Sequence, residues 1–132
     1  MSLQNAIAHI VNENPGLCSD GLYTASHIAQ DPEAFAWFQK ESFSPAFAAQ
    51  VTDALFEMAS RCAFRVDSYA LKNRAEARSG RIVRNGAAIV ALLLAGYEME
   101  KAPRSTSPSF RRPSVPQPHA AWLADEWKEL GA

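Results

Sequence analysis

The fold is decided by residues 44–80, which read SPAFAAQVTDALFEMASRCAFRVDSYALKNRAEARSG. Ser44 is a good helix N-cap. Pro45 suits the first helical position, because the N–H that proline lacks would have no partner there. Apolar side chains then recur every three or four residues, which is the pattern of one buried helical face. They are Phe47, Val51, Ala54, Leu55, Met58, Cys62, Val66 and Tyr69.

The same stretch ends at Gly80, a residue that commonly terminates helices. An unbroken helix over its whole length would span about 50 Å at the usual rise per residue, far more than an average helix. The sequence therefore predicts either one very long helix or two helices with a break near Asp67–Ser68 or Asn73.

Residues 81–101 contain the most apolar run of the chain, 87–95, between Gly86 and Gly96. Because this run is apolar on every side, it predicts a central helix that is buried all round. It is too short to span a bilayer. The alternative place to bury it is an interface between copies of the chain.

Two helical segments open the chain, one over residues 2–14 with Ser2 as its cap and a brief one over 22–30. An aromatic helix follows, and Asp31–Pro32 marks its start. Phe35 and Phe38 share one face of this helix, whereas Trp37 points some way round from them. Most of these rings should fill the corner between two helices, and Trp37 is predicted to be the exception, free to bind a protein.

The composition changes abruptly after residue 102. Residues 103–118 hold five prolines interleaved with serines and arginines, which forbids regular helix and favours an extended path. A helical pattern returns over residues 119–132. The side chains predicted to bind a protein there are Trp122, Leu123, Trp127 and Leu130. Leaving two tryptophans and two leucines in water is costly, so this segment should dock on its own domain or on a second copy.

Together these segments predict an all-α fold. We expect a compact helical bundle of about five helices over residues 1–102, an extended Pro/Ser/Arg-rich linker over 103–118 and a C-terminal amphipathic docking helix over 119–132. The chain has no basic, apolar start typical of a secretory signal and no stretch long enough to cross a membrane, so we expect a cytoplasmic protein. Its two cysteines, Cys18 and Cys62, are expected to stay reduced and mostly buried.

Charge is unevenly distributed along the chain. Residues 1–60 hold seven acidic and one basic residue, whereas residues 61–112 hold eleven basic and four acidic residues. Such segregation indicates either ion pairs between the two halves, which we favour slightly, or a basic surface for an acidic partner. The candidate nucleic-acid-binding residues on such a surface are Lys72, Arg74, Arg78, Arg81 and Arg84.

No pattern in the sequence predicts catalysis. Cys18 and His27 are the nearest to a nucleophile and base, but no glycine-rich oxyanion loop or orienting group accompanies them. The three histidines lack metal-ligand spacing, and no phosphate-binding loop is present. We therefore expect no catalytic residues, metal, cofactor or small-molecule substrate.

The sequence predicts a non-enzymatic protein-interaction module, such as an adaptor, inhibitor or assembly subunit. We expect its C-terminal segment to mediate self-association, as a homodimer, or binding to another protein, because tryptophan and arginine dominate binding hot spots. The alternative is a nucleic-acid-binding or regulatory protein that uses the arginine-rich stretch 72–84. The first hypothesis is preferred because it gives the C-terminal segment a role.

Overall fold

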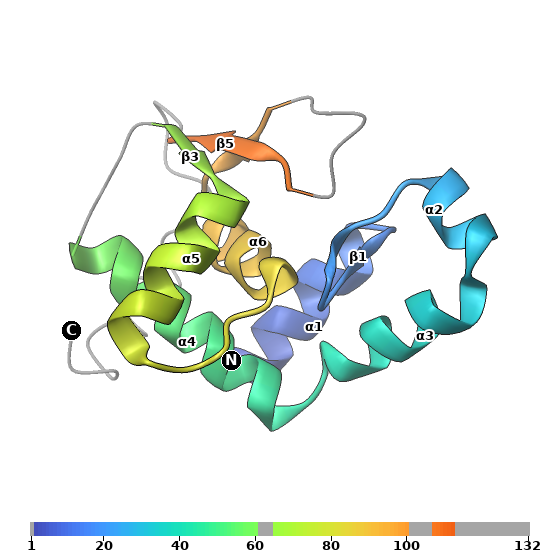
Figure 1. Cartoon of the computed structure of the whole chain (residues 1–132), viewed down its shortest axis with the longest axis horizontal. Coiled ribbons are helices and arrows are strands. Elements are labelled where there is room, and N and C mark those ends of the chain that lie inside the picture. The colour runs from blue at the N-terminus through green and yellow to red at the C-terminus, as the bar shows by residue number, and fades with distance from the viewer. Residues whose placement is uncertain (1, 61–64, 101–106, 113–132) are drawn as a thin grey trace.

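The computed structural model describes residues 2–60, 65–100 and 107–112 (Figure 1). Its helices are α1 (Leu3–Glu13), α2 (Ala25–Gln30), α3 (Pro32–Glu41), α4 (Pro45–Ser60), α5 (Ser68–Ser79) and α6 (Asn85–Leu94). Five short strands form two small antiparallel sheets. One pairs β1 (Leu17–Cys18) with β2 (Gly21–Leu22), and the other has the order β3 (Arg65–Asp67), β5 (Ser109–Arg111), β4 (Glu98–Met99). The protein is mostly helical, but the expected all-α composition and five-helix bundle are not confirmed.

The stretch 44–80 forms two helices instead of one. Helix α4 ends at Ser60 and α5 begins at Ser68, directly after β3, which agrees with the predicted break near Asp67–Ser68. Asp67 caps α5, and its carboxylate accepts a hydrogen bond from the Tyr69 N–H at 2.7 Å. Gly80 ends α5 as predicted, with a positive φ of 70°. Val66 is buried in β3, but the side chain of Tyr69 is 52% exposed, contrary to the predicted face. A new helix begins at Ser68, so the periodicity of α4 no longer determines which way Tyr69 points.

Helix α6 lies at the centre of the described core, as its apolar sequence predicts. It contacts α1, α4 and α5, and every residue except Leu93 is buried (Figure 1). Its first turn is held close to the β1–β2 hairpin, where the Gly86 N–H donates to the Ser19 carbonyl oxygen at 3.0 Å. A Cβ on Gly86 would lie 1.9 Å from the Cys18 carbonyl oxygen, so this approach requires glycine. No helix in the described ranges is long and apolar enough to cross a membrane.

Part of the predicted linker belongs to the folded core. Strand β5 lies between β3 and β4, with Val66 and Met99 as the partners of Phe110. The side chain of Phe110 is fully buried, although it stands in a segment rich in proline and serine. The remainder of the linker, the predicted helix 119–132 and Cys62 lie outside the described residues, and the predicted domain boundary stays a prediction. Cys18 is a buried free thiol.

Helices α2 and α3 extend away from the group formed by α4, α5 and α6, on the right of Figure 1. We call this pair of helices the aromatic arm. Neither helix contains a buried residue. The arm contacts the rest of the protein mainly where α3 packs against β1, and the Ser19 N–H donates to the Phe38 carbonyl oxygen at 3.2 Å. Both helices of the arm are therefore at most partly buried.

Candidate functional site

A groove lies where α3 meets the first turns of α4. It has a volume of about 440 Å³. The residues that line it are Trp37, Lys40, Glu41, Ser44, Ala46, Phe47 and Gln50. Phe47 is buried, whereas the side chain of Trp37 is 58% exposed at the edge. The groove therefore combines an apolar floor with a large exposed aromatic side chain. We call it the α3–α4 groove.

The groove lies between the C-terminal part of α3 and the start of α4, and each of these two helices has its own N-cap. The Asp31 carboxylate accepts a hydrogen bond from the Ala34 N–H at 3.0 Å, with Pro32 at the first helical position of α3. Ser44 repeats the arrangement for α4, where its Oγ accepts from the Phe47 N–H at 3.1 Å and Pro45 begins the helix. Only residues 42–44 separate the two helices, so the chain turns a tight corner and the groove forms on it.

The ring of Trp37 packs against a neighbouring aromatic side chain. It packs edge to face on Phe38 with ring centroids 5.4 Å apart, and the guanidinium of Arg84 lies 5.2 Å from the Phe38 centroid. Tyr23 packs against Phe35 and Phe38 at 5.8 and 6.3 Å, as expected for two rings that share a face. These contacts hold α3 and Trp37 in a fixed geometry, which favours binding because less side-chain freedom is lost.

The charges around the groove are not balanced. Glu41 lies 3.4 Å from the Arg84 guanidinium, so its negative charge is compensated. Lys40 is exposed and makes no ion pair within the described residues. The first turn of α4 adds the positive end of its helix dipole. Lys40 and the start of α4 therefore give a small excess of positive charge to a groove whose lining also includes the polar residues Ser44 and Gln50.

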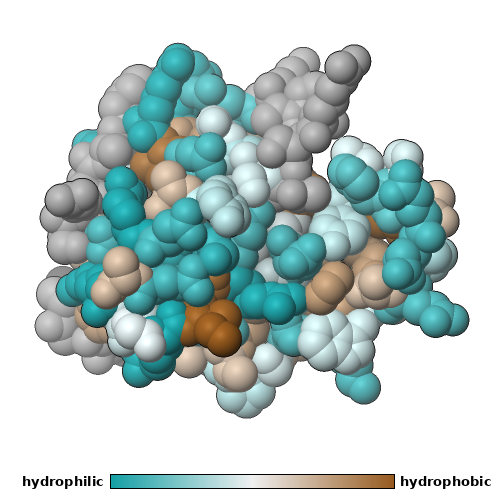
Figure 2. All heavy atoms as spheres, in the orientation of Figure 1, coloured by the Kyte–Doolittle hydropathy of each residue, from teal (hydrophilic) through white to brown (hydrophobic). Residues whose placement is uncertain are grey.

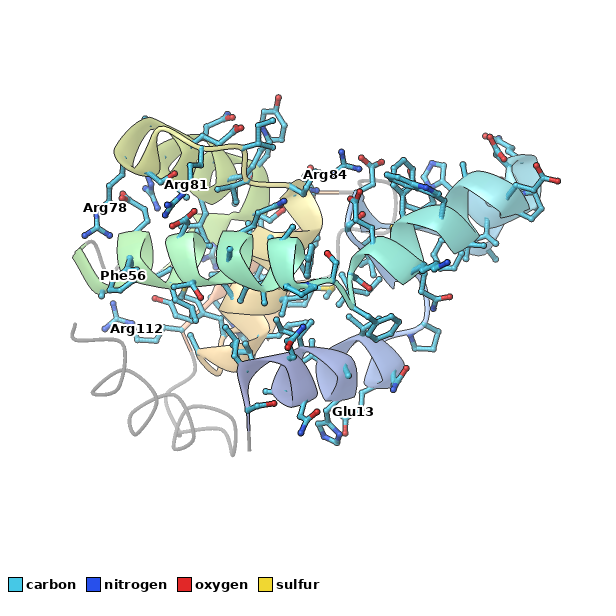
Figure 3. All side chains as sticks on the ribbon, turned by 90° about the horizontal axis from the view of Figure 1, so that it is seen from below. Glu13, Phe56, Arg78, Arg81, Arg84 and Arg112 are labelled. Atoms are coloured by element: carbon cyan, nitrogen blue, oxygen red, sulfur yellow. The ribbon has the colours of Figure 1, made fainter. Side chains whose placement is uncertain are left out.

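The five basic residues of the alternative site do not form one free patch. Arg81 makes a two-pronged hydrogen-bonded ion pair with Asp53, which raises the pKa of Arg81. Arg74 lies 3.8 Å from Glu57, and Arg84 lies close to Asp20 and Glu41. Lys72 bonds to Glu76 and lowers its pKa. Arg78 instead lies 5.7 Å from the ring of Phe56, and Figure 3 shows Arg84 well apart from Arg78 and Arg81.

Most of these ion pairs join the acidic first part of the chain to the basic second part. Asp20, Glu41, Asp53 and Glu57 all belong to residues 1–60, and their partners all follow residue 61. Internal pairing thus accounts for much of the uneven charge distribution. On the face seen in Figure 2, the side chains over α5 are mainly hydrophilic, whereas those over α3 more often have the pale and tan colours of higher hydropathy.

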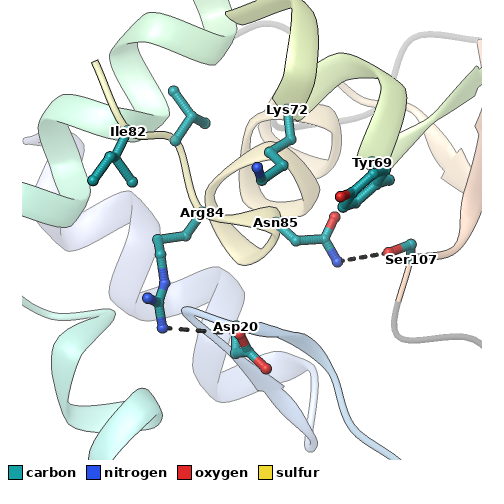
Figure 4. A pocket seen from close by; sticks show the side chains of 8 residues that line it. Asp20, Tyr69, Lys72, Ile82, Arg84, Asn85 and Ser107 are labelled. Atoms are coloured by element: carbon teal, nitrogen blue, oxygen red, sulfur yellow. Dashed lines mark hydrogen bonds and ion pairs between the residues drawn. The ribbon is translucent and has the colours of Figure 1, made fainter. Parts of the chain in front are cut away.

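A second pocket, of about 420 Å³, lies between α5 and the start of α6 (Figure 4). Lys72, Arg84 and Asp20 line it, together with the exposed side chains of Tyr69 and Ile82. Its polar wall includes an Asn85 Nδ2 that donates to Ser107 Oγ at 3.0 Å. Because Asp20 and the nearby Glu76 offset the two cations, the pocket is poorly suited to an anionic ligand.

Cys18 and His27, the residues nearest to a nucleophile and base in the sequence, each interact with other groups in the structure. Cys18 is buried, its Sγ donates to the Gly21 carbonyl oxygen at 3.4 Å, and burial raises its pKa. His27 Nδ1 instead interacts with Thr24 in the cap of α2. In the part of the chain that the structure describes, no three His, Cys, Asp or Glu side chains gather as a metal site.

The predicted protein-binding residues are only partly covered by the structure. Trp37 is exposed at the edge of the groove, as its position on α3 suggested. The other four, Trp122, Leu123, Trp127 and Leu130, lie outside the described residues. The sequence did not identify the groove itself, whose wall includes Ala46 and Gln50 of α4. The available signal was the predicted helix start at Ser44–Pro45, only a few residues after the aromatic residues of α3.

Comparison with known proteins gives no relationship. No family model matches the chain, no curated protein matches it, and no solved structure matches its fold. The function must therefore be argued from the surfaces described above.

Proposed function

We propose that the protein is a non-enzymatic protein-interaction module that self-associates, and that the α3–α4 groove is its binding surface. Trp37 is the anchor residue at the edge of this groove. The C-terminal segment, with Trp122, Leu123, Trp127 and Leu130, is the second contributor to assembly. Tryptophan is among the residues that most often dominate binding energy, and it does so when a partner excludes water from it.

One observation carries this proposal. Helix α3 contains three large aromatic side chains, yet none of its ten residues is buried. Full burial of a large apolar side chain is worth about 1.5–3 kcal/mol, and a partner could recover the part of it that the 58% exposed Trp37 does not gain within the chain. Because Trp37 borders a groove with Phe47 at its floor, its exposure is part of a concave apolar surface and differs from that of an isolated surface residue.

Light scattering behind size exclusion tests self-association of the full-length chain. We expect the wild type to be a dimer. Trp37→Ala and Trp127→Ala should each clearly weaken dimerisation while lowering the melting temperature only little. Tyr69→Ala is the matched control, because this aromatic side chain is 52% exposed but lies in the other pocket. A monomeric wild type, or a dimer that Trp37→Ala leaves unchanged, contradicts the proposal.

A shortened chain for the same experiment should end after Arg112. Ending it near residue 102, at the predicted domain boundary, would remove β5 and the fully buried Phe110. Loss of that strand would lower stability directly, and a change of assembly could then not be attributed to the C-terminal segment.

Nucleic-acid binding through residues 72–84 is the weaker candidate function. Phosphate contacts require cations that can leave their present partners, and four of the five candidate residues are paired with carboxylates of the same chain. Binding to short DNA and RNA duplexes and single strands, measured at low and high salt, tests it. Tight binding that weakens steeply with salt and with Arg78→Gln would reverse this preference.

A further inference from the structure

We propose that the α3–α4 groove receives residues 119–132 of a second copy of this chain, with Trp127 seated against Trp37 and Phe47. This inference rests on the proposed function and names the partner of the same surface. It requires that residues 119–132 match the groove in polarity and charge, and that the chain can bring them to the groove.

Polarity is the first match. Residues 119–132 predict a helix with one apolar stripe, formed by Ala120, Leu123, Trp127 and Leu130. Amphipathic helices bind by placing such a stripe in a groove, with anchor residues three, four or seven positions apart. A groove of about 440 Å³ is within the usual range for ligand pockets, so it can receive a large anchor side chain. Trp127 is the largest side chain near the middle of the stripe.

Charge is the second match. The segment from 113 to 132 holds three acidic residues and one lysine, and the acids Asp125, Glu126 and Glu129 surround Trp127. The groove offers Lys40, which makes no ion pair with any residue that the structure describes, and the positive end of α4, while the charge of Glu41 is compensated by Arg84 at 3.4 Å. An acidic helix is therefore attracted to this groove, whereas a basic helix would be repelled.

The choice of a second copy rests on the proposed self-association. In Figure 3 the last described residue, Arg112, lies at the same end of the molecule as Phe56 and Arg78, whereas α3 lies at the other end. A segment of the same copy would have to cross the length of α4, about 24 Å, to reach the groove. A second copy can present its segment without this crossing, and two copies can do so reciprocally.

The decisive experiment mixes two full-length variants. Trp37→Ala damages the groove but leaves the C-terminal segment intact, and Trp127→Ala does the reverse. Each variant alone should dimerise at least about 30-fold more weakly, the equivalent of about 2 kcal/mol. Their mixture should regain assembly, because one intact groove meets one intact segment. Fusing one variant to a larger carrier separates the mixed dimer from either homodimer by mass.

Each outcome of the mixing experiment decides something. If both variants are monomeric and the mixture remains monomeric, the segment does not enter the groove of another copy, and the inference is wrong. If Trp37→Ala disrupts the dimer but Trp127→Ala does not, the groove binds some other surface; the proposed function then stands without this inference. If neither variant changes the dimer, both are wrong. Tyr69→Ala should itself dimerise normally and, because its groove and segment are both intact, should form mixed dimers with either variant.

A charge exchange tests the orientation of the segment independently. Lys40→Glu should weaken dimerisation several-fold, and Glu126→Lys should do the same. Mixing the two should restore part of the affinity, because the lysine of one copy then faces the glutamate of the other. An equal loss in the mixture would contradict the proposed charge match. Thermal melts of Trp37→Ala, Trp127→Ala, Lys40→Glu and Glu126→Lys should show that each variant remains folded.

Discussion

Helices α3 and α6 are both ten residues long but differ strongly in burial. Every residue of α6 except Leu93 is buried, whereas no residue of α3 is. Helix α6 is apolar after its first residue, Asn85, and has α1, α4 and α5 against it, while α3 has charged residues at both ends and packs mainly on one short strand. Apolar content separates them in part, because eight of the ten residues of α6 are apolar but only five of the ten of α3, three of these being aromatic. The difference is that α6 forms the core, whereas α3 leaves apolar surface exposed, and this is the surface that we propose for binding.

The strongest test of this contrast truncates one large side chain in each helix. Leu92→Ala in α6 removes a fully buried side chain and should lower the free energy of unfolding by about 2–5 kcal/mol. Trp37→Ala in α3 should change it by no more than about 0.5 kcal/mol, since the ring is mostly exposed. Urea denaturation measured on the monomer at low concentration compares them. Equal losses would mean that α3 belongs to the core.

Enlarging one side chain in each helix sharpens the same comparison. Gly86→Ala would place a Cβ 1.9 Å from the Cys18 carbonyl oxygen, so the backbone must shift, at a cost of about 1–3 kcal/mol. The added bulk of Ala36→Leu on the exposed side of α3 should instead be tolerated within about 0.5 kcal/mol. Thermal melts distinguish the two outcomes. A stable Gly86→Ala protein would show that the start of α6 is not held against the hairpin.

The smallest expected effect is a pH dependence at the attachment of the arm. Helix α6 has no titratable side chain, but Tyr23, which packs against α3, donates to Asp20 at 2.5 Å. Burial, and then this hydrogen bond and the negative charge of Asp20, raise the pKa of Tyr23 above its ordinary value of about 10. The folded state thus favours the protonated phenol. Its contribution is complete below about pH 10 and is lost as the pH rises above that value.

Thermal melts between pH 8 and 11 check this prediction with Tyr23→Phe. The wild type should lose stability above about pH 10, and the variant should lose less over the same interval. The buried thiol of Cys18, whose pKa is also raised, should give both proteins a common decline at alkaline pH. Parallel curves for the two proteins would show that ionisation of Tyr23 does not affect folding.

The candidate site was predictable only in part. The position of Trp37 on α3, away from the face shared by Phe35 and Phe38, correctly indicated an exposed ring. The groove beside it depends on how α4 packs against α3, and no periodicity reports that. The arginine-rich stretch is the reverse case. Its sequence indicated a basic surface, but Arg81 and Asp53 are 28 positions apart, so their ion pair could not be assigned from spacing.

What the sequence by itself determined were the features set by neighbouring residues. Helix starts at Asp31–Pro32 and Ser44–Pro45, the stop at Gly80 and the burial of α6 follow from local capping and from the periodicity of apolar residues. Only the tertiary structure decided that Phe110 of a proline-rich segment completes a sheet, that Tyr69 points outward and that most of the cations are neutralised. These features depend on contacts between distant parts of the chain, whose free energy appears only when the elements pack together.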